Sequence, residues 1–242
     1  KRYNPYFKTA WNRELFFSDS EYANFWVVKK ENWNNAINNL EKQGIAINFR
    51  NILFEVINKL VKDDNEKNIY HFPFIVFHNH EKKYKSDDHL DLYNNLRRNK
   101  LLYGDIKKVI PLNESKQYSL SWNCSKEILL SIFIPTKDNL ELLINCLESV
   151  KQNKAGVRTE IIIIDNGSIE ENTINFLDEF KGGDFFANIQ KVLHIPGEFN
   201  YSELNNKASE IAEGYVFLLL NNDIKILSPD WGLKICANSL RP

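Results

Sequence analysis

The sequence predicts an α/β fold in which a mostly parallel sheet with flanking helices follows a smaller α+β region. Three observations lead to this prediction. From residue 129 onward, short apolar runs alternate with stretches of helical periodicity, and several of the runs are rich in β-branched residues. Before that point the chain is rich in Asn, Lys and aromatic residues, and its periodicity is weak. Alternating strands and helices are typical of parallel sheets, because a helical crossover joins consecutive parallel strands.

Each element of the second region has its own signal. Residues 160–164 are β-branched after the first position, which predicts a strand covered on both faces. Gly182 and Gly183 form a stop signal for the helix before them. We expect strands over residues 129–134, 160–164, 189–195 and 216–220, and helices over 140–150, 172–181 and 201–211.

The first region gives fewer signals. Residues 52–61 carry apolar side chains at helical spacing, and a further helix is expected over 90–101. The polar run 63–68 predicts a solvated turn. Short apolar stretches lie at 25–28 and 72–77, and the charged segment 81–88 predicts a solvent-facing connector. These patterns divide the chain into an upstream region over 1–80, a charged linker with a helix over 81–128, and a sheet-containing half over 129–242.

The composition excludes several classes of protein. The 242 residues include 31 Lys and Arg and 32 Asp and Glu, which excludes a strongly basic nucleic-acid binder, so we expect no nucleic-acid partner. The three cysteines are far apart and lack C-x-x-C spacing, which favours a reducing compartment and here the cytoplasm. No apolar run approaches the ~20 residues that span a bilayer. Because methionine is absent, we expect the chain to be a piece of a longer protein.

Short segments rich in polar residues follow three of the four predicted strands. They are Pro135, Thr136, Lys137 and Asp138, then Asp165, Asn166, Gly167 and Ser168, and then Asn221, Asn222 and Asp223. In open α/β sheets, ligands bind outside the carboxyl ends of the strands. Carboxylates and amides gathered there can accept hydrogen bonds from a nucleoside or hold a hard divalent cation through oxygen atoms. Taken singly, the second and third groups are also typical of turns and Lys137 of a solvated lysine, so a structural interpretation stays open.

Other site motifs are absent from the sequence. Neither G-x-G-x-x-G nor G-x-x-x-x-G-K-[ST] follows the first strand, so little supports a dinucleotide fold or a P-loop. The five histidines form no metal motif, and we expect a structural or surface role for His78 and His80.

The order of the segments resembles family 2 glycosyltransferases of the GT-A (Rossmann-like) fold, and among them the rhamnosyltransferase-like enzymes of bacterial surface-polysaccharide synthesis. The resemblance covers residues 129–242 nearly without gaps. It rests on L-S-I-F-I-P-T-K-D at 130–138, I-I-I-D-N-G-S at 162–168, F-N-Y-S-E-L-N-N at 199–206, G-Y-V-F-L-L-L-N-N-D at 214–223 and S-P-D-W at 228–231.

The resemblance implies a nucleoside pocket after the first two strands. Pro135, Thr136 and Lys137 would line this pocket. Asp165 would contact the base or the ribose of a nucleotide-diphosphate sugar donor.

The resemblance also implies a place for the donor diphosphate. Asn205 and Asn206 would open the helix that borders the donor site, and Asn222 would contact the donor. Asp223, together with Asn221, would bind Mn2+ or Mg2+ where the family has its D-x-D motif. Asn221 replaces the first acid of that motif, and because an amide oxygen is a weaker ligand than a carboxylate, we expect a low metal affinity.

The first region resembles another part of the family, the acceptor half of an upstream module in enzymes that carry two GT-A modules in tandem. The similar segments are residues 5–11, 25–30, 69–78 and, for the helix between modules, 92–101. Where the family has a D-Y-D-L-like segment with the candidate catalytic base, the chain reads Asn48-Phe49-Arg50-Asn51, without a carboxylate. The catalytic residues are therefore unknown, and Asp230 and Glu198 are candidates for the base by sequence order alone.

Three functions remain in competition. The first is metal-assisted transfer of a sugar from a nucleotide-diphosphate donor to a growing polysaccharide or lipid-linked glycan. The second is a non-catalytic GT-A-like module in polysaccharide assembly, which the missing carboxylate near Arg50 favours. The third, a nucleotidyltransferase, generally needs a Gly-rich loop with Arg or Lys after the first strand, which is absent here. Peripheral association with the inner membrane face would suit a lipid-linked acceptor, although no basic amphipathic helix supports it.

Overall fold

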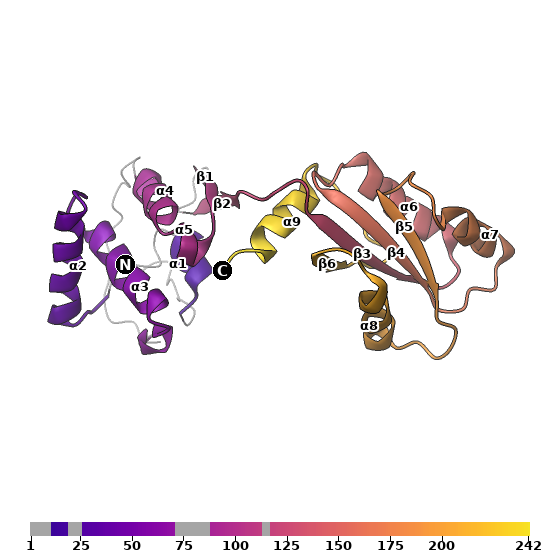
Figure 1. Cartoon of the computed structure of the whole chain (residues 1–242), viewed down its shortest axis with the longest axis horizontal. Helices are drawn as coiled ribbons and strands as arrows, with labels where there is room; N and C mark the ends of the chain where they lie inside the picture. Colours follow the sequence, from indigo (N-terminus) through magenta and orange to yellow (C-terminus); the bar gives the residue numbers. More distant parts are fainter. Residues whose placement is uncertain (1–10, 19–25, 71–87, 113–116) are drawn as a thin grey trace, which may run out of the picture. The chain divides into compact units, whose positions relative to one another are not determined.

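The computed structural model describes residues 11–18, 26–70, 88–112 and 117–242 (Figure 1). The chain divides into two compact units, one of residues Lys1–Asn123 with Arg241–Pro242 and one of residues Cys124–Leu240. The apolar stretch 72–77, His78, His80 and most of the charged segment 81–88, for which the sequence made predictions, lie outside the described residues.

A four-stranded parallel sheet forms the centre of the second unit (Figure 1). Its strands are β3 (Leu129–Thr136), β4 (Arg158–Asp165), β5 (Ile189–His194) and β6 (Val216–Leu219). They lie in the order β5-β4-β3-β6, and each neighbouring pair is parallel. The predicted α/β class with a mostly parallel sheet is therefore confirmed.

Helices cover both faces of this sheet. The four helices are α6 (Leu140–Gln152), α7 (Glu171–Phe180), α8 (Tyr201–Ile211) and α9 (Trp231–Ser239). Side chains from α6, α7 and α9 join one hydrophobic cluster with alternate residues of β3 and β4, and side chains from α8 join a second cluster with the residues between them. The sheet is thus the middle layer, with α8 on the face opposite α6.

Strand β4 confirms the prediction of a strand buried on both sides. Ile161 and Ile163 belong to the cluster with α6, whereas Ile162 and Ile164 belong to the cluster with α8. All four isoleucine side chains are fully buried. Successive side chains of a strand point to opposite faces, so a continuous apolar run is what a doubly covered strand requires.

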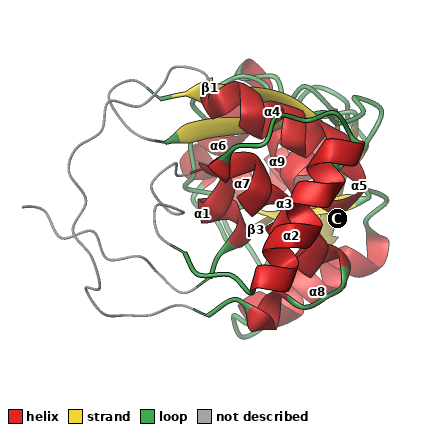
Figure 2. Cartoon of the chain, turned by 90° about the vertical axis from the view of Figure 1, so that its left-hand side faces the viewer, coloured by secondary structure: helices red, strands yellow, loops and turns green. Residues whose placement is uncertain are grey.

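The first unit combines short helices with an antiparallel strand pair. Its elements are α1 (Arg13–Ser18), α2 (Lys30–Lys42), α3 (Phe49–Lys62), η1 (Glu66–Asn68), α4 (Asp88–Arg98), α5 (Lys100–Tyr103), β1 (Ile106–Pro111) and β2 (Tyr118–Trp122). Strands β1 and β2 pair in antiparallel fashion, and α4 packs against β1 (Figure 2). This mixture agrees with the predicted smaller α+β region.

Two local predictions in the first unit are confirmed. Helix α3 confirms the helical spacing of residues 52–61 and buries one apolar side against α2. The polar run 63–68 is a turn as predicted, with Asp64 at a positive φ of 53° and most of its residues exposed. Glu66 accepts a hydrogen bond of 2.7 Å from the Trp11 indole and forms an ion pair with Arg13. The sequence did not reveal these two contacts, because the partners are remote in sequence.

Candidate functional site

The carboxyl ends of all four parallel strands meet at one edge of the sheet, which we call the carboxyl edge. The backbone ties neighbouring segments together there. The amide of Asn166 donates to the Thr136 carbonyl at 2.9 Å, and the amide of Ile195 donates to the Asp165 carbonyl at 2.8 Å. The groups that the sequence placed after separate strands therefore lie on adjacent strands at this edge.

Asp165 is the most constrained side chain at the carboxyl edge. It ends β4 and is buried, and its Oδ1 accepts hydrogen bonds from the Ser168 amide at 2.9 Å and the Ser168 hydroxyl at 2.6 Å. Its Oδ2 lies 3.0 Å from Nδ1 of His194. Burial raises the pKa of Asp165, but the hydrogen bonds from Ser168 and His194 outweigh it and hold the pKa below its ordinary value. Asp165 is therefore a carboxylate at neutral pH.

Ser168 joins the segment after β4 to the segment after β3. Its hydroxyl accepts a 2.7 Å hydrogen bond from the Asp138 amide while it donates to Asp165. The Asp138 carboxylate in turn accepts from the amides of Ile169 and Glu170, at 2.8 and 2.9 Å, just before α7. Asp138 has a φ of 52°, which is unfavourable for a residue with a side chain. These hydrogen bonds stabilise the strained conformation.

A second link joins the segment after β6 to β3. Nδ2 of Asn222 donates to the Thr136 hydroxyl at 3.2 Å, and Thr136 itself is buried at the end of β3. Asn221 and Asp223, on either side of Asn222, are exposed. The turn thus anchors its middle residue and leaves the two predicted metal ligands open to solvent.

The other predicted donor-binding residues differ in their surroundings. Pro135 is half-buried in β3, and Lys137 is exposed beyond it. Asn205 is buried, and its Oδ1 has no hydrogen-bond partner in the described part of the chain, whereas Asn206 is exposed.

The expectation that Asn205 and Asn206 open their helix is wrong by one turn. Helix α8 begins at Tyr201, because the Asn200 side chain accepts a hydrogen bond from the Glu203 amide and caps the helix there.

His194 is a site residue that the sequence reasoning missed. It ends β5 and pairs in register with Asp165 at the end of β4. No motif surrounds it, and the two residues become neighbours only through the parallel pairing of the strands. Knowledge of the β4–β5 register would have been the signal that found it.

The candidate bases lie at different places. Asp230 precedes α9, and its amide donates to the Lys154 carbonyl at 2.9 Å, in the loop that enters β4 from the amino end. It is therefore at the sheet edge opposite Asp165, so its position does not suit the base of a reaction at the carboxyl edge. Glu198 is exposed in the loop between β5 and α8, which leaves the carboxyl edge.

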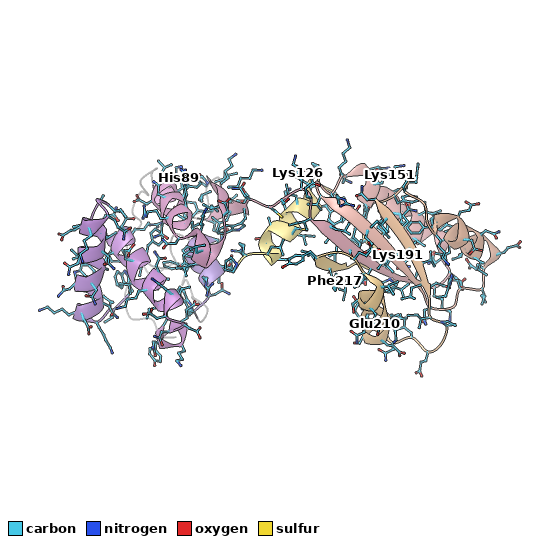
Figure 3. All side chains as sticks on the ribbon, in the orientation of Figure 1. His89, Lys126, Lys151, Lys191, Glu210 and Phe217 are labelled. Carbon is cyan, nitrogen blue, oxygen red and sulfur yellow. The ribbon has the colours of Figure 1, made fainter. Side chains whose placement is uncertain are left out.

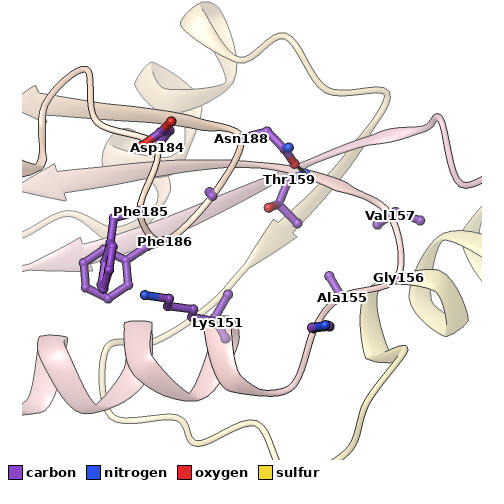
Figure 4. A pocket seen from close by; sticks show the side chains of 12 residues that line it. Lys151, Ala155, Gly156, Val157, Thr159, Asp184, Phe185, Phe186 and Asn188 are labelled. Atoms are coloured by element: carbon purple, nitrogen blue, oxygen red, sulfur yellow. Dashed lines mark hydrogen bonds between the residues drawn. The ribbon is translucent and has the colours of Figure 1, made fainter.

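A pocket of about 550 Å³ also lies at the amino edge of the sheet, between the end of α6 and the loop that enters β5 (Figure 4). The Lys151 ammonium group lies over the Phe185 ring there. None of the predicted donor-binding residues lines this pocket.

The chemistry of the turn after β6 fits a divalent cation only in part. Among the described residues, no three His, Cys, Asp or Glu side chains gather closely enough to hold a metal ion. A cation held by Asp223 and the Asn221 amide would therefore need further oxygen ligands from water or from donor phosphates, which is usual for Mg2+. Exposure of both side chains permits such a shared site.

Part of the second unit is similar in sequence to known proteins. Residues 131–235 match the profile of the family described as "Glycosyl transferase family 2". The uncharacterized protein y4gI of Sinorhizobium fredii is 34% identical over 125 residues, which are 52% of this chain and 13% of that protein. The O-antigen biosynthesis protein RfbC of Myxococcus xanthus is 26% identical over 126 residues, which are 52% of this chain and 10% of that protein. The matched segment thus spans only about a tenth of these relatives.

Solved structures show a more distant likeness. S. aureus TarS, residues 1–349, is 22% identical with a TM-score of 0.34, and the match covers 46% of this chain and 31% of that one. The same fragment in complex with UDP has a TM-score of 0.33 over the same shares of the two chains.

None of the helices in the described ranges has both the length and the apolar character needed to cross a membrane.

The family match begins at Ser131 in β3 and ends in α9. It therefore includes the three polar segments that follow β3, β4 and β6 at the carboxyl edge. The chain contains a glycosyl transferase family 2 domain over residues 131–235.

Proposed function

We propose that the protein is a rhamnosyltransferase-like glycosyltransferase of the tandem-module type, which transfers a sugar from a nucleotide-diphosphate donor to a growing polysaccharide or lipid-linked glycan. The observation that carries the proposal is the buried Asp165 carboxylate at the carboxyl edge, held by Ser168 and His194 within the family 2 segment. The name of RfbC, an O-antigen biosynthesis protein, supports a glycan as the product.

The residues of the carboxyl edge would share the work of binding the donor. Asp165 would accept a hydrogen bond from the nucleoside, with Pro135, Thr136 and Lys137 beside it. The unpaired Oδ1 of Asn205 supports a role in donor binding, because a buried acceptor without a partner is costly unless a ligand satisfies it. Asn206, exposed on the same helix, and Asn222 would border the donor from α8 and from the turn after β6.

Asp223 and Asn221 would hold Mn2+ or Mg2+ against the donor diphosphate. When bound, such a cation stabilises the negative charge that develops on the leaving nucleoside diphosphate. The exposure of both residues supports this assignment. A cytoplasmic location with peripheral membrane contact stays a prediction from the sequence.

Calorimetry on the full chain tests the proposal with UDP and dTDP in the presence of Mn2+. We expect one of the two nucleotides to bind, and we expect Asp165→Ala and Asp223→Ala to weaken its binding at least tenfold, since each removes a charged contact. Asp178→Ala, an exposed acid on α7, is the matched control and should bind as the wild type does. Absence of nucleotide binding, or wild-type affinity in both site variants, would contradict the proposal.

One observation favours a second candidate, a non-catalytic module in polysaccharide assembly. Asn48, in the segment where the resemblance expects a catalytic acid, instead caps α3 by accepting a 2.8 Å hydrogen bond from the Asn51 amide. Measuring transfer or hydrolysis of UDP-sugars and dTDP-sugars by the full chain separates the two candidates. Turnover that Asp223→Ala abolishes supports the enzyme, and nucleotide binding without any turnover supports the module.

A further inference from the structure

His194 has a fixed place beside Asp165. The two residues are register partners at the ends of β5 and β4, and their side chains meet at 3.0 Å. The backbone on both sides is also tied, because the Ile195 amide donates to the Asp165 carbonyl and the Asn166 side chain donates to the Ile195 carbonyl, each at 2.8 Å. The backbone on both sides of the pair is therefore fixed, and Asp165 holds the imidazole at the carboxyl edge.

The hydrogen bonds of Asp165 nearly saturate its carboxylate. An ionised carboxylate has about four acceptor sites, two on each oxygen. Ser168 occupies both sites of Oδ1, and His194 occupies one site of Oδ2. One acceptor site, on Oδ2, is left for an incoming group. Because His194 takes the other site of Oδ2, the position of the imidazole decides the direction that the remaining site faces.

The protonation of the imidazole follows from its partner. Because Asp165 is ionised and can only accept, Nδ1 of His194 must carry the proton that forms their bond. The Asp165 side chain is only 8% exposed, whereas the His194 side chain is 50% exposed. The imidazole therefore lies at the boundary between the buried carboxylate and solvent, on the side from which a ligand would approach.

We propose that His194 is a positioning residue of the nucleotide site, which orients Oδ2 of Asp165 so that its one remaining acceptor site receives an N–H or O–H group of a nucleoside. This inference rests on the proposed function. It assigns nucleoside recognition to a pair of adjacent strand ends rather than to Asp165 alone.

A double-mutant cycle on the full chain tests the inference, with UDP and dTDP as probes and Mn2+ present. His194→Ala should weaken binding of the preferred nucleotide about two- to tenfold, the usual value of one hydrogen bond. His194→Asn, whose amide nitrogen can replace Nδ1 as the donor, should recover most of that loss. In the Asp165→Ala background, His194→Ala should have no further effect, because its only route to the nucleotide has been removed. His89→Ala on α4, in the other unit, is the matched control (Figure 3).

The outcomes separate this inference from the proposed function. If the wild type binds nucleotide and His194→Ala binds equally well, the inference is wrong and the proposed function stands. An equal loss in the presence and absence of Asp165 also overturns the inference, because His194 would then act independently. If the wild type binds neither nucleotide, the proposed function fails and the inference falls with it. Should His194→Ala not fold, His194→Phe, which keeps a ring but has no hydrogen-bonding group, takes its place in the same comparison.

Discussion

Strand β4 carries a buried acid at each side of its isoleucine run, Glu160 and Asp165. Both accept hydrogen bonds from a serine hydroxyl and a backbone amide. Both also have a basic neighbour on β5, which is Lys191 for Glu160 and His194 for Asp165. The same set of groups thus occurs twice on one strand, once near the amino edge of the sheet and once at the carboxyl edge.

The two acids differ in how far they and their basic partners are exposed. Glu160 is fully buried, and its oxygens receive Ser131, the Glu213 amide and the Lys191 ammonium, the last at 2.6 Å. Gly214 packs directly against this cluster. A larger residue would not fit there, because its Cβ would lie 2.7 Å from the Ser131 amide nitrogen. Asp165 has the same number of partner groups, but its side chain is 8% exposed and that of His194 is 50% exposed, against 0% for Glu160 and 26% for Lys191. A closed cluster of this kind holds the fold together, whereas an open one can bind a ligand.

Removing the Glu160 carboxylate should have the largest effect on folding. In Glu160→Ala, the Ser131 hydroxyl and the Glu213 amide lose their buried acceptor, and the free energy of unfolding should fall by about 3 kcal/mol. Urea unfolding measures this change. Glu210→Ala breaks only an exposed ion pair with Lys207 and should change stability by less than about 0.5 kcal/mol. A loss of similar size in both variants would remove the distinction between closed and exposed groups.

Asp165→Asn should have the opposite pattern, with a small loss of stability and a large loss of nucleotide affinity. The amide keeps one oxygen for Ser168, so the free energy of unfolding should fall by only about 1 kcal/mol. Nucleotide affinity should fall at least tenfold, because the charged acceptor is gone. Parallel urea unfolding and calorimetry measure the two effects. A loss of stability as large as that of Glu160→Ala, with binding retained, would show that Asp165 is also a structural acid.

Ser168→Ala should weaken both properties slightly. The variant loses the acceptor of the Asp138 amide and one donor to Asp165, and about 0.5–1 kcal/mol of stability should be lost. Nucleotide affinity should fall a few-fold because the strained segment after β3 loses one of its ties. Ser209→Ala on α8 removes a hydroxyl that bonds only within its own helix and serves as the control. Equal behaviour of the two serine variants would contradict a special role for Ser168.

The smallest expected effect is a pH dependence shared by both acids. Burial raises each pKa, but hydrogen bonds outweigh it, and both values lie below the ordinary 4.5 of Glu and 3.8 of Asp. The folded state therefore binds fewer protons than the unfolded state, so this stabilisation is complete above those ordinary values and is lost as the pH falls through the lowered ones.

Urea midpoints measured from pH 6 to pH 3 check this dependence. Because Glu160→Gln lacks the titrating group, its deficit relative to the wild type should shrink as the pH falls. A deficit that grows toward acid pH would contradict the sign of the shift.

The repeating pattern of the second unit was sufficient to predict its four strands and the helices α6, α7 and α8, but not α9. The isoleucine run of β4 and the glycines after α7 are local signals, and each element needs only its own residues to be recognised. The polar groups at the strand ends were also found, since they follow directly after apolar runs.

Contacts set by strand register could not be predicted in this way. Glu160 bonds to a serine 29 positions away and to an amide 53 positions away, and His194 lies 29 positions from Asp165. One sequence does not reveal which strands are neighbours or how they align. The turn at Asp138 was missed for a related reason, because its positive φ is stabilised by amides near α7 rather than by its own neighbours.

The four buried isoleucines of β4 place the strand in the core of the second unit. Amides of such a strand exchange with deuterium only when the whole unit opens, so they report its global stability. A nucleotide bound at Asp165 would then leave its trace as slower deuterium uptake along the length of β4, not merely at the strand end that it touches. Mass spectrometry of the peptides that cover β4 could thus detect a ligand without any knowledge of which sugar it carries.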